Sequence, residues 1–256
     1  MPKSFGELLE LMWVEDALHF SEYCIDDDFH GCSLRLDDGN SVDGSDAYCI
    51  NGYLEELGDV LFKQHFDGLG NNATLADIAC ITMGQSPKGS SYNENGDGAV
   101  FYQGRAEFGW RYPTKRLSTT EPKRMAKCGD VLVSVRAPVG DLNLAYEDCC
   151  IGRGLAAIHC EHPSFCLYLM RSLHDKLDAF NGEGTVFGSI SGKALKSLPI
   201  ALPGKREIKD FEDEVSLIDR QIRSNELESR SLTALRDVLL PKLMSGEIDV
   251  SEVGFK

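Results

Sequence analysis

The feature that most constrains this chain is a run of apolar residues at alternating steps of three and four near its C-terminus. These positions are Ile208, Phe211, Val215, Ile218 and Ile222, followed beyond two polar positions by Leu232 and Leu239. An α-helix over residues 206–240 would be about 52 Å long at about 1.5 Å per residue. A helix that long needs another helix to cover its apolar seam, so the heptads predict coiled-coil pairing. A solvent-exposed connector is the alternative. Pro241 is expected to disrupt the helix, and Ser245 and Gly246 to end it.

The formal net charge of −15 is unevenly distributed. Residues 1–71 contain 3 Lys or Arg and 16 Asp or Glu, residues 72–205 contain 15 and 13, and residues 206–256 contain 8 and 12. Net charge bears on partners and solubility rather than on fold, and a mean over unlike segments hides the field of each segment. The acidic balance therefore does not exclude nucleic acid as a partner of the middle segment.

The first 50 residues form an acidic segment to which the sequence assigns no role. Apolar spacing predicts a helix over residues 5–20, and the Asp-, Gly- and Ser-rich residues 21–50 predict loops. Asp37–Asp46 lack the ligand spacing and terminal Glu of a calcium-binding loop, so a solvated acidic loop is the preferred interpretation. Residues 51–72 predict a helix with Asn51 as its N-cap, followed by a Gly- and Asn-rich linker.

Residues 73–205 differ in texture from both flanks. Short β-branched and aromatic runs alternate with Gly, Pro and Asn, which is typical of strands joined by tight turns. One helix is predicted to begin at Pro163, because apolar residues then recur every three or four positions up to Phe180. The predicted fold class is α+β: a mixed, β-rich domain, a long coiled-coil helix at residues 206–245 and a C-terminal tail at 246–256.

No constellation of catalytic or metal-binding residues is evident. The glycines at 152–154 and 182–188 lack dinucleotide-binding spacing and are interpreted as turns. The residues His159, Cys160, His162 and Cys166 lack the paired spacing of a zinc site. No nuclease or methyltransferase motif is found, so we predict no catalysis, no metal and no cofactor in this chain. An enzyme with an unrecognised motif is a rival, which a metal- or cofactor-dependent activity of the isolated chain would establish.

Cysteine usage and hydropathy predict a cytoplasmic protein. The 9 cysteines are odd in number and scattered, which favours a reducing compartment over a disulfide framework. The sequence has no apolar run of the roughly 18 residues needed to span a membrane, and its first residues lack a signal-peptide pattern.

Residues 103–127 carry a local excess of positive charge. They contain 7 Lys or Arg against 2 Asp or Glu, interspersed with Phe108, Trp110 and Tyr112. Such a surface binds phosphates with release of counterions, and Arg and Gln side chains can read guanine and adenine edges. An ordinary solvated face with a few core aromatics is an equally good interpretation of the composition.

Several blocks of the sequence, in order, resemble the specificity subunit of type I restriction–modification systems. The blocks are NGYLEELGDVLFKQHF at residues 51–66, ATLADIACITMGQSPKG at 73–89, GDVLVSVRAPVGDLNLA at 129–145, IGRGLAAI at 151–158, GTVFGSISGKALKSLPIALP at 184–203 and LRDVLLPKLMSGEIDV at 235–250. Their order and spacing extend over about 200 residues, and residues 1–50 fall outside the resemblance.

The resemblance implies a role in DNA recognition. In this family two target-recognition domains alternate with two conserved helices that pack antiparallel. Each domain reads half of a split DNA site, and the helices dock modification (methyltransferase) subunits and, through them, the restriction subunit. This chain carries one recognition domain, one complete helix and a shortened piece of the other helix. It is therefore expected either to form a homodimer, which would read an inverted repeat, or to pair with another specificity half.

We therefore predict that residues 73–203 read double-stranded DNA. S-adenosylmethionine, ATP and magnesium would belong to the partner subunits. The candidate contacts are Gln85, Ser86 and Lys88 in a loop at the DNA face, Lys115, Arg116, Lys123, Arg124 and Lys127 as phosphate or groove contacts, and Gln103 and Arg105 as base readers. The alternative is a protein-interaction module that binds modification subunits without reading DNA, which the acidic N-terminal segment favours.

Overall fold

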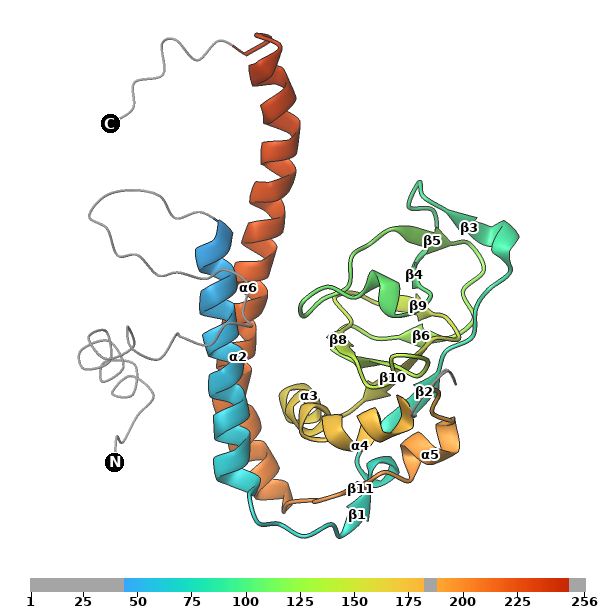
Figure 1. Cartoon of the computed structure of the whole chain (residues 1–256), viewed down its shortest axis with the longest axis vertical. Coiled ribbons are helices and arrows are strands. Elements are labelled where there is room, and N and C mark those ends of the chain that lie inside the picture. The colour runs from blue at the N-terminus through green and yellow to red at the C-terminus, as the bar shows by residue number, and fades with distance from the viewer. Residues whose placement is uncertain (1–43, 182–187, 249–256) are drawn as a thin grey trace, which may run out of the picture. The chain divides into compact units, whose positions relative to one another are not determined.

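The computed structural model describes residues 44–181 and 188–248 (Figure 1). The helix predicted at residues 5–20, the acidic loops up to residue 43 and most of the C-terminal tail lie outside these ranges. The described residues from 51 onward belong to one compact unit. Apart from the first turns of one helix, all the elements below lie in it.

In the described ranges, one helix precedes a run of short strands, three short helices and a last strand follow, and one long helix ends the order (Figure 1). The helices are α2 (Gly44–Phe66), α3 (Pro163–Ser172), α4 (His174–Asp178), α5 (Gly192–Lys196) and α6 (Lys205–Met244). The strands are β1 (Ala73–Thr74), β2 (Cys80–Met83), β3 (Tyr92–Asn93), β4 (Ala99–Tyr102), β5 (Leu117–Thr119), β6 (Met125–Ala126), β7 (Val131–Ser134), β8 (Leu142–Leu144), β9 (Cys149–Ile151), β10 (Leu155–His159) and β11 (Pro199–Ile200). The predicted α+β class, a β-rich domain followed by a long helix, is confirmed.

Two sheets form the centre of the β-rich domain. One has four strands in the order β2-β10-β7-β8, and the other has five in the order β3-β5-β4-β9-β6. Strand β7 is buried on both faces: Val131 and Val133 belong to the core cluster that includes the helices, and Leu132 belongs to the cluster shared with the second sheet. Because successive strand residues point to opposite faces, the four-stranded sheet lies between the helices and the five-stranded sheet.

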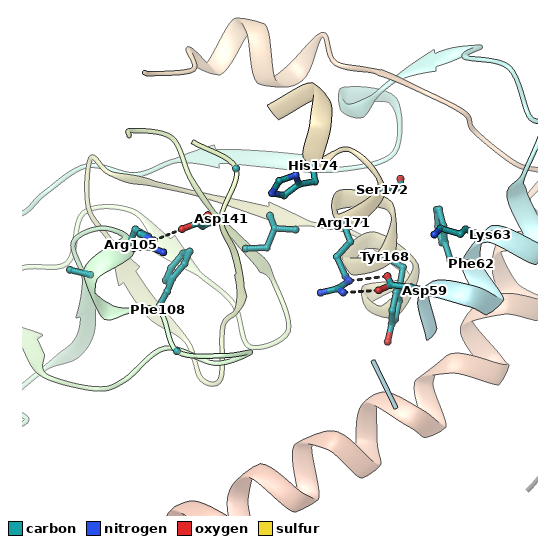
Figure 2. A pocket seen from close by; sticks show the side chains of 14 residues that line it. Asp59, Phe62, Lys63, Arg105, Phe108, Asp141, Tyr168, Arg171, Ser172 and His174 are labelled. Carbon is teal, nitrogen blue, oxygen red and sulfur yellow. Dashed lines mark hydrogen bonds and ion pairs between the residues drawn. The ribbon is translucent and has the colours of Figure 1, made fainter. Parts of the chain in front are cut away.

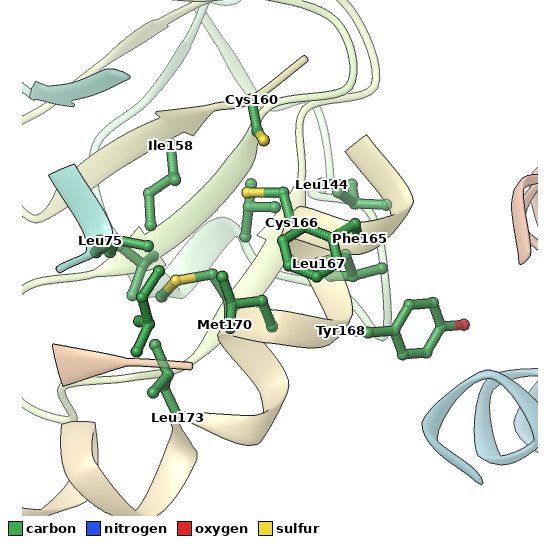
Figure 3. Packing of buried hydrophobic residues seen from close by; sticks show 14 of the residues in the cluster. Leu75, Leu144, Ile158, Cys160, Phe165, Cys166, Leu167, Tyr168, Met170 and Leu173 are labelled. Carbon is green, nitrogen blue, oxygen red and sulfur yellow. The ribbon is translucent and has the colours of Figure 1, made fainter. Parts of the chain in front are cut away.

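Helix α3 packs against the four-stranded sheet through side chains that include Phe165 and Met170 (Figure 3). The single helix predicted from Pro163 to Phe180 is wrong in one respect, because α3 ends before Leu173 and α4 begins after it. Leu173 and Leu177 are nevertheless both buried. The apolar spacing is therefore satisfied by two short helices in place of one.

The N-terminal half of the predicted seam on α6 is buried inside this chain. Residues Ile208, Phe211, Val215, Ile218 and Ile222 are at most 5% exposed and belong to one core cluster with residues of α2 and α3. The ring of Phe211 lies edge-on to Phe62 and Phe66 of α2, with centroids 5.6 and 5.3 Å apart. Helix α2 is thus a helical partner for this half of the seam. The C-terminal half is more open, with Leu232 58% exposed and Leu239 half-buried.

Two predicted helix ends are wrong. Asn51 is an interior residue of α2, which begins at Gly44, and its side-chain oxygen accepts a hydrogen bond from Asn225 of α6 at 2.8 Å. Helix α6 also continues through Pro241 to Met244. Proline removes one backbone donor, but the ladder resumes after it, since the Ser245 amide donates to the Pro241 carbonyl at 2.9 Å. Gly246, with φ +73°, follows the end of the helix as expected.

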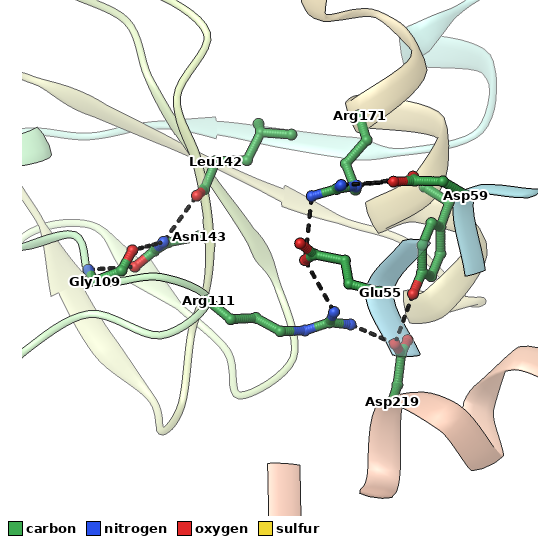
Figure 4. Close-up of polar contacts among 9 residues, drawn as sticks. Glu55, Asp59, Gly109, Arg111, Leu142, Asn143, Arg171 and Asp219 are labelled. Atoms are coloured by element: carbon green, nitrogen blue, oxygen red, sulfur yellow. Dashed lines mark hydrogen bonds and ion pairs between the residues drawn. The ribbon is translucent and has the colours of Figure 1, made fainter. Parts of the chain in front are cut away.

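A network of buried charges joins the β-rich domain to both helices (Figure 4). Arg111, whose side chain is 2% exposed, forms ion pairs with Glu55 of α2, at 3.1 Å, and with Asp219 of α6. Arg171 of α3 pairs with Glu55 at 3.1 Å and with Asp59 at 2.6 Å. Arg111 therefore does not belong to the positive surface expected of residues 103–127.

The pKa values within this network show how burial and pairing compete. Burial raises the pKa of the Glu55 carboxyl, against the opposing effects of Arg171 and Arg111. Burial acts to lower the pKa of Arg111, but Asp219, Tyr168 and Glu55 outweigh it, so this pKa lies above its ordinary value. Arg111 thus remains charged, and the carboxylates around it depend on that charge.

Replacing Arg111 with an apolar side chain of similar length, Arg111→Met, tests this dependence. We expect the free energy of unfolding to fall by about 3 kcal/mol, because Glu55 and Asp219 lose a buried counter-charge. This loss should become smaller as the pH is lowered. Without Arg111 the pKa of the Glu55 carboxyl rises further. A carboxyl whose pKa is raised in the folded state favours folding at low pH, and this contribution is lost as the pH rises through the raised pKa. Urea unfolding at neutral and acidic pH measures both effects.

The matched control is Arg206→Met. Arg206 forms an exposed ion pair with Asp210 one turn along α6, at 3.8 Å. Exposed pairs contribute little, so this change should alter the free energy of unfolding by no more than about 0.5 kcal/mol. Equal losses in the two variants would contradict a special role of the buried network.

Candidate nucleic-acid interface

The register of the five-stranded sheet brings several polar segments to one end. Strands β4 and β9 are parallel, and their last residues, Tyr102 and Ile151, are paired. Strands β5 and β6 run the other way and begin at this end, where Leu117 pairs with Phe101 and Met125 pairs with Cys150. The residues that follow β4 and β9 and those that precede β5 and β6 therefore lie together.

Backbone hydrogen bonds fix these segments to one another. The Gly152 amide donates to the Tyr102 carbonyl at 2.8 Å, and the Gly154 amide donates to the Gln103 carbonyl at 3.2 Å. The Gln85 amide donates to the carbonyl of Ile151 at 2.9 Å, which attaches the loop after β2 to the same end. In the same way, the amide of Ile151 donates to the Arg124 carbonyl at 2.9 Å.

Glycine is required where these backbones meet. A Cβ atom on Gly152 would lie 2.8 Å from the Cα atom of Gln103, and one on Gly84 would lie 2.1 Å from the carbonyl oxygen of Gly152. Neither distance leaves room for a side chain, because the opposing atoms belong to backbone. The turn at 152–154, interpreted from sequence as a simple turn, is thus the point where three segments join.

We call the exposed or half-exposed side chains at this end the sheet-end surface. They are Gln85, Ser86, Gln103, Arg105, Arg116, Lys123, Arg124 and Arg153. Seven of these residues were candidates from sequence, and the structure brings them together. Arg153 was missed. Its flanking glycines were the available signal, since an arginine between two glycines that must approach other backbone is held at a fixed position.

Three other candidates lie elsewhere. Lys88 precedes the turn Gly89–Ser91 that leads into β3, whose first residue pairs with the last residue of β5, at the opposite end of the sheet. Lys115 points its Nζ atom toward Glu147, at 3.8 Å. Lys127 follows β6, and so also lies at the opposite end.

The cations of the sheet-end surface fall into two groups. Arg105 is paired with Asp141, and Arg116 with the buried Glu107 at 3.1 Å. In contrast, Lys123, Arg124 and Arg153 make no ion pair with any residue that the structure describes. Since Asp141 and Glu107 are each paired with an arginine of this surface, the three cations without an ion pair add positive charge there.

An open cleft of about 700 Å³ begins beside Arg105 (Figure 2). The Arg105–Asp141 pair and Phe108 form one wall, and the Arg171–Asp59 pair of α3 and α2 lies across from them. The cleft is lined by Asp59, Phe62, Lys63, Arg105, Ala106, Phe108, Gly109, Gly140, Asp141, Leu142, Tyr168, Arg171, Ser172 and His174. Its walls combine charged side chains with apolar ones such as Phe62, Phe108 and Leu142.

Three of the four residues considered for zinc have other surroundings. The Nδ1 atom of His159 lies 2.6 Å from Asp130, and Cys160 and Cys166, the latter on α3, are buried in the core (Figure 3). Within residues 44–181 and 188–248, no three His, Cys, Asp or Glu side chains are grouped so as to hold a metal ion. In the same ranges, none of the helices combines the length and apolarity that crossing a membrane requires.

Two curated proteins are similar to this chain. It is 39% identical over 199 residues to the MjaX type I restriction enzyme specificity subunit of Methanocaldococcus jannaschii, and the match covers 76% of this chain and 46% of that protein. It is 25% identical over 186 residues to the type I restriction enzyme HindI specificity subunit of Haemophilus influenzae, covering 68% of this chain and 40% of that protein. The chain belongs to the type I restriction specificity subunits. The family resemblance inferred from sequence blocks is confirmed.

Comparison with solved structures supports the same family assignment. The HsdS subunit from Thermoanaerobacter tengcongensis is 31% identical, with a TM-score of 0.54 over 79% of this chain and 53% of that one. A chain from a structure of a type I restriction–modification system, studied for complex assembly and conformational transition, is 32% identical with a TM-score of 0.55, over 77% of this chain and 53% of that one. The S subunit from M. genitalium, 17% identical with a TM-score of 0.58, supports the fold alone. No family model matches the chain.

The comparisons also show a difference in length. This specificity subunit spans about half the length of the relatives that it matches. Within residues 51–248 the structure contains one β-rich domain, between α2 and α6. Similarity alone therefore does not assign the activity of a full-length specificity subunit to this chain.

Substituting the glycine at the junction, Gly152→Ala, tests how the sheet-end surface is built. We expect the free energy of unfolding to fall by about 1–3 kcal/mol, because the new methyl group would overlap the backbone at Gln103. Gly104→Ala is the control, since a Cβ atom there meets nothing within 4 Å and its φ of −171° suits any residue. Urea unfolding compares the two, and equal stability of both variants would contradict the tight junction.

Proposed function

We propose that residues 73–203 read one half of a split duplex DNA sequence through the sheet-end surface. The observation that carries this proposal is the convergence of amide and cationic side chains from four separate segments at one end of the five-stranded sheet. Composition alone left a solvated face as an equal interpretation. Convergence favours binding, because a DNA surface needs phosphate-binding cations and hydrogen-bonding amides within reach of one groove.

The two groups of cations suit two kinds of contact. Lys123, Arg124 and Arg153 have no carboxylate to displace and are suited to phosphates, which position the protein without reading sequence. Gln103 is fixed by its backbone and is suited to an adenine edge, and Arg105 to a guanine edge. Lys123, Arg124 and Arg153 would thus bind DNA through their charge, whereas Gln103 and Arg105 would select bases through their geometry.

A chain with one recognition domain requires a second one to read a split site. Helix α6 offers a means of pairing, because its C-terminal half exposes a run of large apolar side chains. They include Leu232, Leu235, Val238, Leu240 and Leu243, each between 39% and 58% exposed. The proposed partner is another specificity half, either a second copy of this chain or a separate one. A symmetric pair of identical chains would read an inverted repeat.

The chain itself is proposed to direct catalysis without performing it. Modification subunits would dock on the helices and carry out methylation with S-adenosylmethionine, and a restriction subunit would supply ATP- and magnesium-dependent cleavage. This assignment is supported by the relatives, which are named as specificity subunits, and by the similar chain in a structure of a type I restriction–modification system.

The phosphate role predicts a change in salt dependence. With modification subunits present, replacing Lys123 and Arg124 together by alanine should lower the slope of log affinity against log salt by about 2, because each phosphate contact contributes about 0.9. The control removes two exposed charges from the opposite end of the same sheet, with Lys88 and Lys127 replaced by alanine, and should leave the slope unchanged. An unchanged slope in the first variant would remove both residues from the interface. If no duplex in a random pool is preferred by the wild-type complex, the chain is an interaction module that does not read DNA.

The pairing role predicts loss of association when the exposed seam is charged. Replacing Leu232 and Leu239 by glutamate should weaken pairing at least about 100-fold, since burying each leucine contributes about 1.5–3 kcal/mol. Leu217→Glu is the control, because Leu217 is 44% exposed on the half of α6 whose seam is already covered. Equilibrium sedimentation measures the association, and a wild-type chain that stays monomeric at high concentration would exclude self-pairing and leave a separate half as partner.

A further inference from the structure

One arginine of the sheet-end surface is held differently from the others. The Nε atom of Arg105 donates to the Oδ2 atom of Asp141 (Figure 2). Neither Nη group of Arg105 has a hydrogen-bond partner within the described residues, and the side chain is 58% exposed. By comparison, Arg116 has its Nη2 group occupied by Glu107. Asp141 thus fixes the side of the Arg105 guanidinium and leaves its end free.

Asp141 is itself held rigidly. Its amide donates to the Oγ atom of Ser134 at 3.0 Å, and its carbonyl accepts from the Ser134 amide at 2.9 Å. Ser134 is fully buried in β7, and its hydroxyl also donates to the Pro138 carbonyl at 2.6 Å. Next to Asp141, Gly140 adopts φ +102° against Leu177, where a Cβ atom would lie 2.9 Å from the Leu177 side chain. The carboxylate therefore projects from a hairpin whose backbone has little freedom.

The backbone of Arg105 is fixed from the other side. It begins a single helical turn in which the Glu107 carboxylate accepts from the Gly104 amide at 3.1 Å and the Glu107 amide donates to the Gly104 carbonyl at 3.4 Å. Gly104 lies next to Gly154, whose amide is bonded to Gln103. Both ends of the Arg105–Asp141 pair are thus attached to ordered backbone, and the pair joins the surface to the cleft.

We infer that Asp141 is a positioning residue for sequence reading, which orients Arg105 so that its two Nη groups meet a guanine edge. This inference rests on the proposed DNA-reading function. A guanine presents two acceptors, O6 and N7, in the major groove, and the end of a guanidinium offers two donors in one plane that match them. An arginine free to rotate must be ordered on binding, whereas one held at Nε is already aligned. A phosphate contact would not need such alignment, since a phosphate accepts from many directions.

The test separates position from charge with two substitutions at one site. Asp141→Ala removes both the acceptor and the negative charge, whereas Asp141→Asn removes the charge but keeps an acceptor oxygen for the Nε atom. Both should raise the sequence-independent part of the affinity for duplex DNA, because a negative charge has been removed near the DNA. Only Asp141→Ala should lose base preference. Asp97→Ala, at an exposed loop residue of the same domain, is the control for charge alone.

The measurement is selection of bound duplexes from a random pool by the full chain with its modification subunits. We expect Arg105→Lys, which keeps the charge but loses the paired donors of the guanidinium, to reduce preference for one G·C pair about 5- to 150-fold, as expected for a bidentate contact worth about 1–3 kcal/mol. Asp141→Ala should lose most of the preference at the same position, and Asp141→Asn should retain most of it. Thermal unfolding of each variant confirms that the domain is folded.

The outcomes distinguish this inference from the function on which it rests. If the wild-type complex selects a sequence but Asp141→Ala leaves every base preference unchanged, or weakens binding to all sequences equally, Asp141 is not a positioning residue. The same conclusion follows if Asp141→Asn and Asp141→Ala lose preference equally. If the wild-type complex selects no sequence at all, the DNA-reading function itself is wrong, and the inference fails with it.

Discussion

The buried guanidinium of Arg111 is the contact on which the arrangement of the β-rich domain and the helices depends. Apolar contacts of Phe165 on α3 with Phe62, Phe66 and Phe211 pack the domain against the helices, but apolar packing tolerates small rotations. An ion pair with hydrogen-bond geometry does not. Because Arg111 engages Glu55 of α2 and Asp219 of α6 together, it fixes the domain relative to both helices.

Part of this fold could be predicted from sequence because it depends on local periodicity. The seam from Ile208 to Ile222 is buried as the heptads indicate, and alternating apolar runs gave the β-rich class. The burial of Arg111 could not be predicted, since its partners are 56 and 108 residues away along the chain. By composition alone, Arg111 is one of seven Lys or Arg residues in the stretch 103–127 and cannot be distinguished from the other six. The break at Leu173 was missed for a related reason: apolar spacing shows which residues are buried, but not whether one helix or two carry them.

The candidate site also depends on contacts between distant segments of the chain, which are set by strand register. Sequence could identify the basic stretch 103–127 and the loop at 85–88, but not the parallel pairing of β4 with β9 that joins them. This pairing is why Gln103 and Arg153 are neighbours. The antiparallel pairing of β6 with β9 carries Lys127, only three residues from Arg124, to the other end of the sheet. Spacing along a strand determines the end at which a side chain lies, so a cluster in sequence separates into different surfaces. The glycines at 84, 152 and 154 were the one local trace of this convergence.

The same structure explains how a chain with a net charge of −15 can carry the proposed DNA-binding surface. At physiological ionic strength, fields between exposed charges decay over about 8 Å, so the charges within that distance of the surface decide its sign. The carboxylates of Asp141 and Glu107 at this surface are both engaged by arginines, which cancels their repulsion of phosphate. One pairing has a further consequence: Asp141 holds Arg105 at its side and leaves the hydrogen-bonding end open. A carboxylate placed in this way opposes affinity through its charge while favouring selectivity through geometry, so the two properties can vary independently at one surface.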